Sequence, residues 1–115
     1  MQYDLEERTA KFSEKSILCA RKIKRDAVNF PLTTQFVRSA TSIGANYTEA
    51  INASSKKDFR NNICISKKEA QETHYWLRLL KGIEEINEVE RQSLLKEVQE
   101  LILIFQKIIP SCDRK

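Results

Sequence analysis

Glycine and proline are scarce in this sequence of 115 residues, which has two of each. Because glycine and proline are common in turns and loops, their scarcity favours helices joined by short turns. The sequence also lacks an uncharged apolar stretch of about 18 residues, the length of a membrane-spanning helix. Its polar N-terminus does not resemble a signal peptide. We therefore expect a cytoplasmic protein that does not contact a membrane.

Residues for metal and redox chemistry are few as well. His74 is the single histidine, and the three cysteines, Cys19, Cys64 and Cys112, are widely spaced. This pattern disfavours a metal site and indicates reduced thiols. The sequence shows no glycine-rich phosphate loop and no nucleophile paired with a base. We therefore predict no catalytic residue, no metal, no cofactor and no enzymatic activity.

What the sequence does contain is a regular alternation of apolar and charged residues. Hydrophobic residues make up 41% and charged residues 31%, with a net charge of +4. Apolar residues recur in steps of three and four, which predicts helices over roughly residues 5–28, 34–54, 56–81 and 88–109. Such helices with short connections predict an all-α fold, an antiparallel up-down-up-down four-helix bundle. The length indicates one domain of residues 1–115.

Capping residues mark where these helices should begin. Asp4, Ser55 and Asn87 precede the first, third and fourth helices, and their side-chain oxygens can accept unpaired backbone N–H groups. Thr33 or Thr34 could do the same for the second helix. We therefore expect a cap at the start of every helix.

Proline and glycine should mark the other boundaries. Phe30 precedes Pro31, and a residue before proline is pushed out of the helical region, so this pair should end the first helix. Gly82 tolerates the left-handed conformation that ends many helices and should stop the third. Pro110 should follow the fourth helix directly.

A polar line accompanies the apolar stripe on the second predicted helix, and a comparable line lies on the third. Its members are Arg38, Ser42, Asn46, Glu49, Glu69 and Glu72. A turn near residue 55 would bring Arg38 beside Glu72. We interpret the line as a polar seam in which carboxylates satisfy an arginine and fix helix register. The alternative is a catalytic or ligand pocket, which the lack of accompanying catalytic groups disfavours.

The fourth predicted helix has more apolar surface than one buried stripe requires. Residues 101–105 are all apolar, so Leu103 or Ile104 should point away from the core. Trp76 and Leu79 likewise lie beside the main stripe of the third helix. Exposed apolar surface usually marks an interface, so these four residues are candidates for self-association. The alternative is a broadly buried fourth helix that long side chains cover.

Basic residues gather where the third helix begins. Lys56, Lys57 and Arg60, with Lys107 nearby, form a local excess of cations beside the positive end of a helix dipole. We predict that these residues bind nucleic-acid phosphates without reading base sequence. A solvated surface is the alternative. The cluster of residues 21–25 should instead be neutralised by glutamates of residues 84–90 at the other end of the bundle.

Two segments carry a resemblance to a known family. Residues 38–50 (RSATSIGANYTEA), Phe59 and residues 68–77 (KEAQETHYWL) resemble the small bacterial four-helix bundle proteins. This family is also called the 23S rRNA intervening-sequence protein family, because some members are encoded within insertions in large-subunit rRNA genes. The resemblance implies a ring-like homo-oligomer, pentameric in known structures, without an established enzymatic activity. It extends to the accessory variability proteins of diversity-generating retroelements, which bind nucleic acid and a reverse transcriptase.

Two functions are therefore open at the level of the sequence. The first is an oligomeric protein that binds RNA or DNA through backbone charge and presents it to a protein partner. The second is a ring-shaped scaffold that binds another protein and no nucleic acid.

Overall fold

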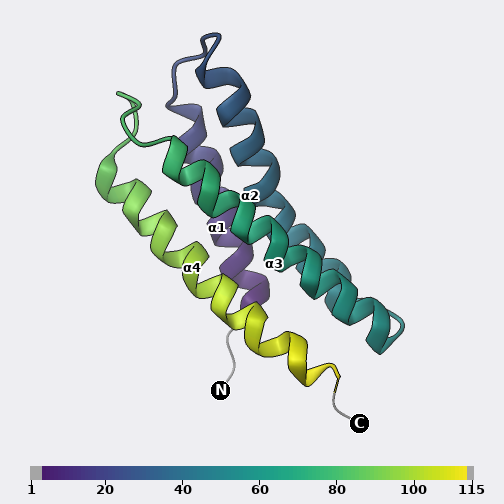
Figure 1. Cartoon of the computed structure of the whole chain (residues 1–115). Helices are drawn as coiled ribbons and strands as arrows, with labels where there is room; N and C mark the ends of the chain where they lie inside the picture. The colour runs from purple at the N-terminus through teal and green to yellow at the C-terminus, as the bar shows by residue number, and fades with distance from the viewer. Residues whose placement is uncertain (1–3, 114–115) are drawn as a thin grey trace.

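The computed structural model describes residues 4–113 and contains four α-helices in this range, without a strand. They are α1 (Leu5–Arg21), α2 (Asn29–Ile51), α3 (Lys56–Leu79) and α4 (Glu88–Ser111). The helices run alternately up and down (Figure 1). The predicted all-α, antiparallel four-helix bundle is confirmed. Residues 1–3 and 114–115, which the sequence assigns to the same domain, lie outside the described range.

Each helix packs against two neighbours. The neighbouring pairs are α1–α2, α2–α3, α3–α4 and α1–α4, and the last of these is the least closely packed. The connections α1–α2 and α3–α4 lie at one end of the bundle, and the α2–α3 turn lies at the other, where α1 begins and α4 ends (Figure 1). The bundle is therefore most open between α1 and α4.

The core follows the predicted stripes of apolar residues in steps of three and four. Each helix directs one stripe toward the bundle axis, where water is excluded and close packing is possible. The largest fully buried apolar side chains are Phe12, Phe36, Ile43, Ile63, Leu77, Leu80, Val98, Leu101 and Phe105.

A glycine permits the close approach of α1 and α2. A Cβ atom at Gly44 would lie 3.1 Å from the Thr9 hydroxyl oxygen and 3.2 Å from the Thr9 Cβ. Real Cβ contacts are rarely so short, so a larger residue would require Thr9 to shift by a few tenths of an ångström. The absence of a side chain at Gly44 therefore allows α2 to pack closely against Thr9 of α1.

Three of the four expected caps are confirmed. Asp4, Ser55 and Asn87 each accept the backbone N–H of the residue three positions later, at 3.4, 3.1 and 3.1 Å. These bonds satisfy donors that a helix start would otherwise leave unpaired.

The predicted boundary between the first two helices is wrong. α1 ends at Arg21, and α2 begins at Asn29, ahead of the Phe30–Pro31 pair. Pro31 therefore lies in the first turn of α2 and does not end α1. A first-turn proline is well tolerated, because the N–H it lacks would have no partner within the helix.

The cap expected at Thr33 or Thr34 is also wrong. Asp26 takes this role, since its carboxylate accepts the N–H groups of Val28 and Asn29 at 3.0 and 2.7 Å. The two threonines lie inside α2, where each hydroxyl donates to the carbonyl four residues earlier at 2.8 Å. Asp26 was not expected to be a cap, because the predicted first helix of residues 5–28 contained it.

The ends of α3 and α4 differ from each other. Gly82 adopts the left-handed conformation expected of it, with φ of 92°, just after α3 ends at Leu79. Pro110, by contrast, lies within the last turn of α4, so the expectation that it follows the helix is wrong. A proline this close to a C-terminus removes one hydrogen bond, and Cys112 N–H closes the turn on Ile109 O at 3.1 Å.

One charged residue is buried in the bundle. Arg91 of α4 is 3% exposed, and its Nη1 donates to the carbonyl oxygen of Leu77 at 2.9 Å. Its Nε and Nη2 each donate to the carboxylate of Glu88 at 2.7 Å. Leu77 O is one of the last carbonyls of α3, which have no partner within the helix. Arg91 therefore caps α3 from the neighbouring helix.

Candidate binding surfaces

The polar seam joins α2 to α3 at one point. Arg38 forms ion pairs with Glu72 and, at 3.3 Å, with Glu69, which is the register that the sequence predicts. Trp76 Nε1 donates to Glu72 Oε2 at 3.0 Å, and this bond, followed by the bond from Arg38, lowers the pKa of Glu72. The Arg38 side chain is 44% exposed. Such surface pairs usually stabilise a protein by at most about 1 kcal/mol.

The remaining members of the seam do not reach across to α3. Ser42 and Asn46 donate to carbonyls of their own helix, at 2.6 and 2.8 Å. Glu49 is exposed near the end of α2. The seam is therefore a local cluster around Arg38 on the outside of the bundle.

Buried hydroxyls make the deeper polar contacts between α2 and α3. Thr73 Oγ1 donates to Ser39 Oγ at 2.8 Å, and Ser66 Oγ donates to the carbonyl of Ile43 at 3.0 Å. All three hydroxyl residues are fully buried. Because unpaired polar groups are costly in a core, these bonds favour one register of the two helices. These bonds were not predicted from the sequence.

The four candidates for self-association do not share a face. Trp76 is half-buried beside Glu72 on the α2–α3 side, and Leu79, 41% exposed, follows on the same stripe. Leu103 is 48% exposed on the α1–α4 side. Ile104 is only 6% exposed and packs in the core, so it is corrected to a core residue. The adjacent positions diverge because one residue rotates a helix by about 100°.

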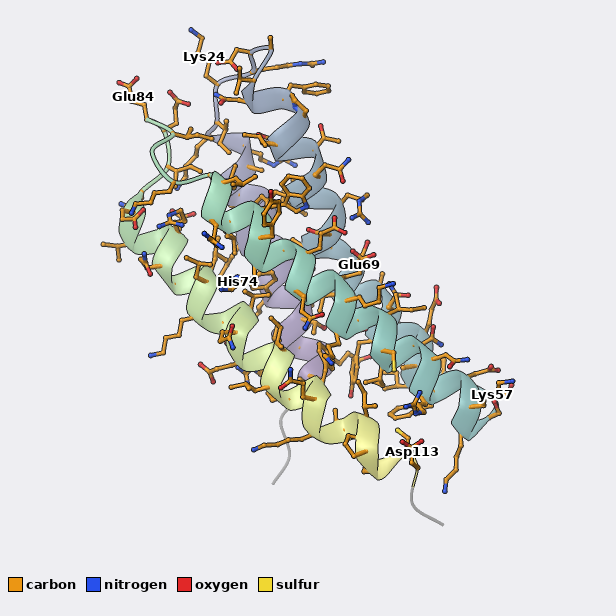
Figure 2. All side chains as sticks on the ribbon, in the orientation of Figure 1. Lys24, Lys57, Glu69, His74, Glu84 and Asp113 are labelled. Carbon is orange, nitrogen blue, oxygen red and sulfur yellow. The ribbon has the colours of Figure 1, made fainter. Side chains whose placement is uncertain are left out.

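The cationic candidates lie at the end of the bundle expected for them. Figure 2 shows Lys57 and Asp113 at one end, and Lys24 and Glu84 at the other. Lys56 and Lys57 are exposed in the first turn of α3 and have no ion-pair partner among residues 4–113.

The other two cationic candidates differ from this pair. Arg60 Nε pairs with Asp113 Oδ1 at 2.9 Å, so its charge is largely compensated. Lys107 lines a hollow with Arg8 and Leu103 on the α1–α4 side. The structure therefore leaves Lys56 and Lys57 as the accessible pair at the start of α3.

The basic cluster at the opposite end is partly neutralised, as the sequence predicts. Lys22 pairs with Glu90 at 3.0 Å, and the carboxylate of Glu85 accepts the backbone N–H of Lys24 at 2.9 Å. The guanidinium of Arg25 lies 4.2 Å above the ring of Phe30, a cation–π contact.

A long groove separates α1 from α4, which the sequence analysis missed. It consists of three adjoining hollows of about 950, 250 and 200 Å³. The first two share Lys15, Ser93 and Leu94, and the last two share Arg8 and Glu100. We call this continuous feature the α1–α4 groove.

The groove carries more cations than its carboxylates can pair. Arg8 pairs with Glu97 at 2.7 Å and with Glu100 at 3.5 Å, and Lys22 pairs with Glu90. These are all the acidic residues that line the three hollows. The lining cations without an ion-pair partner in the described part of the chain are Lys15, Arg21, Lys96 and Lys107.

The part of the chain that the structure describes offers neither a metal site nor a membrane span. Within residues 4–113, no three His, Cys, Asp or Glu side chains gather closely enough to hold a metal ion. None of the helices in this range combines the length and the apolar character that crossing a membrane requires.

These features define a small four-helix bundle whose most prominent surfaces are a charged groove and a cationic end. The chain belongs to the 23S rRNA-intervening sequence protein family, which it matches over residues 2–107. The crystal structure of a protein with unknown function from Bacteroides thetaiotaomicron, a member of the S23 ribosomal protein family, superposes on this chain with a TM-score of 0.81. The two sequences are 34% identical, and the match covers 90% of this chain and 96% of the other. No curated protein matches. The relation to accessory proteins of retroelements stays a prediction.

Proposed function

We propose that this protein is a non-enzymatic, cytoplasmic homo-oligomer that binds the phosphate backbone of RNA or DNA. The observation that supports binding is the pair of exposed lysines, Lys56 and Lys57, which lack ion-pair partners among the described residues. They lie at the start of α3, where the helix dipole also favours an anion. Self-association would repeat this pair in every subunit and increase the local positive charge.

Reversing both charges, Lys56→Glu with Lys57→Glu, is expected to weaken binding to mixed-sequence RNA and DNA by similar factors. Phosphate binding releases counterions, so the logarithm of affinity falls linearly with the logarithm of salt concentration. Losing two phosphate contacts should reduce that slope by about two. Fluorescence anisotropy of a labelled oligonucleotide across a salt series measures both quantities.

The matched control reverses Arg78 and Lys81, two exposed cations at the far end of α3. This variant has the same net charge as the test variant, so a difference between them reports position and not total charge. Two results contradict the site: wild-type protein that does not bind at low salt, or binding that persists unchanged after reversal of Lys56 and Lys57.

The outer face of α3 is the proposed surface for self-association. Tyr75 and Leu79 are exposed there beside the half-buried Trp76, and Ile65 is exposed further along the same helix. Leu103 is a lone exposed apolar residue on residues 101–105 of α4, because Ile104 is buried. The α3 face therefore has the larger apolar surface, which is typical of an interface.

Leu79→Lys is expected to convert the assembly to monomers, because a charge within an apolar interface must be desolvated. Multi-angle light scattering measures the mass, and circular dichroism checks that helicity is retained. Leu103→Lys on the other side of the bundle is the control and should leave the mass unchanged. A wild-type protein that is monomeric at tens of micromolar would rule out self-association at this strength.

A scaffold that binds another protein is the second candidate function. The observation that favours it is the α1–α4 groove, in which Leu18 is 58% and Val89 is 80% exposed. Apolar side chains in a concave surface are typical of sites that bind an apolar partner.

A further inference from the structure

We propose that the α1–α4 groove binds one acidic, amphipathic α-helix of a partner protein. This inference rests on the second candidate function and specifies the partner's chemistry. It depends on three features of the groove: the spacing of its lining residues, their aliphatic character and their charge.

Both walls of the groove have the spacing of a helix-packing seam. On α4, one row of lining residues follows in steps of four and three: Val89, Ser93, Lys96, Glu100, Leu103 and Lys107. The corresponding row on α1 consists of Arg8, Lys11, Lys15 and Leu18, and it continues to Lys22 at the C-cap of this helix. This alternation is the spacing with which helices interdigitate side chains in coiled coils and bundles.

The groove also has the length of a helix. The α4 wall from Val89 to Lys107 extends for about 27 Å at 1.5 Å per residue, which is about five turns. The two walls are antiparallel and loosely packed against each other. A helix lying between them could contact both stripes along this length.

The apolar lining residues are aliphatic. Leu18, Val89 and Leu103 are exposed at separate points along the groove, and the lining aromatic residue, Phe12, is buried. Single-stranded nucleic acid gains much of its binding energy by stacking bases on aromatic rings. Aliphatic side chains in a helical spacing instead suit the leucine-type stripe of a helix. The lining therefore favours a helix over a nucleic-acid strand.

The charges determine which helix fits. Each glutamate of the groove pairs with a cation of the groove, whereas Lys15, Arg21 and Lys96 keep no acidic partner within residues 4–113. Acidic residues beside the apolar stripe of a partner helix would pair with these cations. Opposite charges in flanking positions select the partner and its orientation.

A synthetic peptide of about 18 residues, five helical turns, tests the inference. It carries leucine in steps of three and four and glutamate beside the leucines, with a fluorescent label for anisotropy. Wild-type protein should bind this peptide and induce its helical circular dichroism. The lysine version, with the same leucines but lysine for glutamate, should bind at least about tenfold more weakly.

Two variants separate the apolar and electrostatic contributions. Leu18→Gln with Val89→Gln removes exposed apolar surface without changing charge, and Lys15→Glu with Lys96→Glu reverses charge without touching the aliphatic residues. Each should weaken peptide binding by at least about tenfold. Val28→Gln with Ile51→Gln, at two exposed apolar positions that do not line the groove, is the matched control and should bind like the wild type. The four residues substituted in the two groove variants are all exposed, so both variants should keep the fold.

Several results would overturn the inference. One is a peptide that does not bind, or that binds the wild type and both groove variants alike. Another is a sequence-scrambled peptide of the same composition that binds equally well, which would leave the scaffold function standing without a helix. Loss of oligonucleotide binding in the leucine–valine variant would assign the groove to nucleic acid, and loss of self-association would assign it to a second copy. The Lys56 and Lys57 experiment is independent of all these outcomes.

Discussion

Ile104→Lys is expected to lower the free energy of unfolding by at least about 3 kcal/mol, whereas Leu103→Lys should change it by less than about 1 kcal/mol. Ile104 packs in the core, so lysine there removes buried apolar contacts and brings a charge into an apolar environment. Leu103 is half exposed, and a lysine at this position can extend its ammonium group into water.

Urea unfolding followed by circular dichroism measures both variants at one protein concentration. The concentration must be matched because self-association also contributes to stability. Equal losses at the two positions would mean that α4 is rotated from the orientation described. A Leu103 variant less stable than the Ile104 variant would reverse the assignment of the two faces.

This pair also shows where the sequence stops being informative about α4. The steps of three and four predict its buried stripe, and Leu101, Ile102 and Phe105 are buried as expected. Periodicity alone could not choose between Leu103 and Ile104, because both are apolar and both lie beside the stripe. The choice depends on the rotation of α4 between α1 and α3, which is a property of tertiary packing.

Helix boundaries illustrate the same division. Ser55 and Asn87 were predictable because a cap acts on the N–H three residues later, and the relevant sequence is local. The start of α2 was not, since Pro31 is compatible both with a connection and with the first turn of a helix. The neighbouring residues decided between these options, with Asp26 supplying the bonds that hold the first turn.

The candidate surfaces were predictable to different degrees. The pairing of Arg38 with Glu72 follows from the position of the α2–α3 turn, because antiparallel helices pair residues at equal distances from it. The pairing of Arg60 with Asp113 depends on how far α4 continues beyond Pro110, so it could not be predicted from the sequence. This pairing makes Arg60 less available to bind an anion. The α1–α4 groove could have been predicted from the second row of residues in steps of three and four on α4, from Val89 to Lys107. This row was not recognised because it lies next to the more apolar buried stripe.

Arg91→Ala is expected to lower the free energy of unfolding by about 2 to 4 kcal/mol. The substitution leaves the buried carbonyl of Leu77 without its donor, and it removes the packed aliphatic stem of the arginine. Because a charged residue is rarely fully buried, sequence analysis had no reason to place Arg91 inside. Its burial is explained by the bonds that it makes to α3 and to Glu88.

Arg91→Met separates these two contributions, because methionine retains apolar bulk but cannot donate to Leu77. It should be more stable than Arg91→Ala and less stable than the wild type, as measured by urea unfolding. If alanine causes no loss, the bond from Arg91 to the end of α3 does not contribute to stability.

The acid dependence of the protein reports the other contact of Arg91, its ion pair with Glu88. The hydrogen bonds from Arg91, followed by that from Gln92, lower the pKa of Glu88 from 4.5 to about 2. A carboxyl with a lowered pKa contributes stability above its unfolded pKa, and this contribution is lost as pH falls toward the folded value. The loss from Glu88 should therefore occur between pH 4.5 and about 2. In Arg91→Ala the pKa of Glu88, followed by NMR of its side-chain carboxyl, should return toward its ordinary value, and this acid-dependent loss should shrink. A Glu88 pKa that stays near 2 in the variant would show that other groups hold it down.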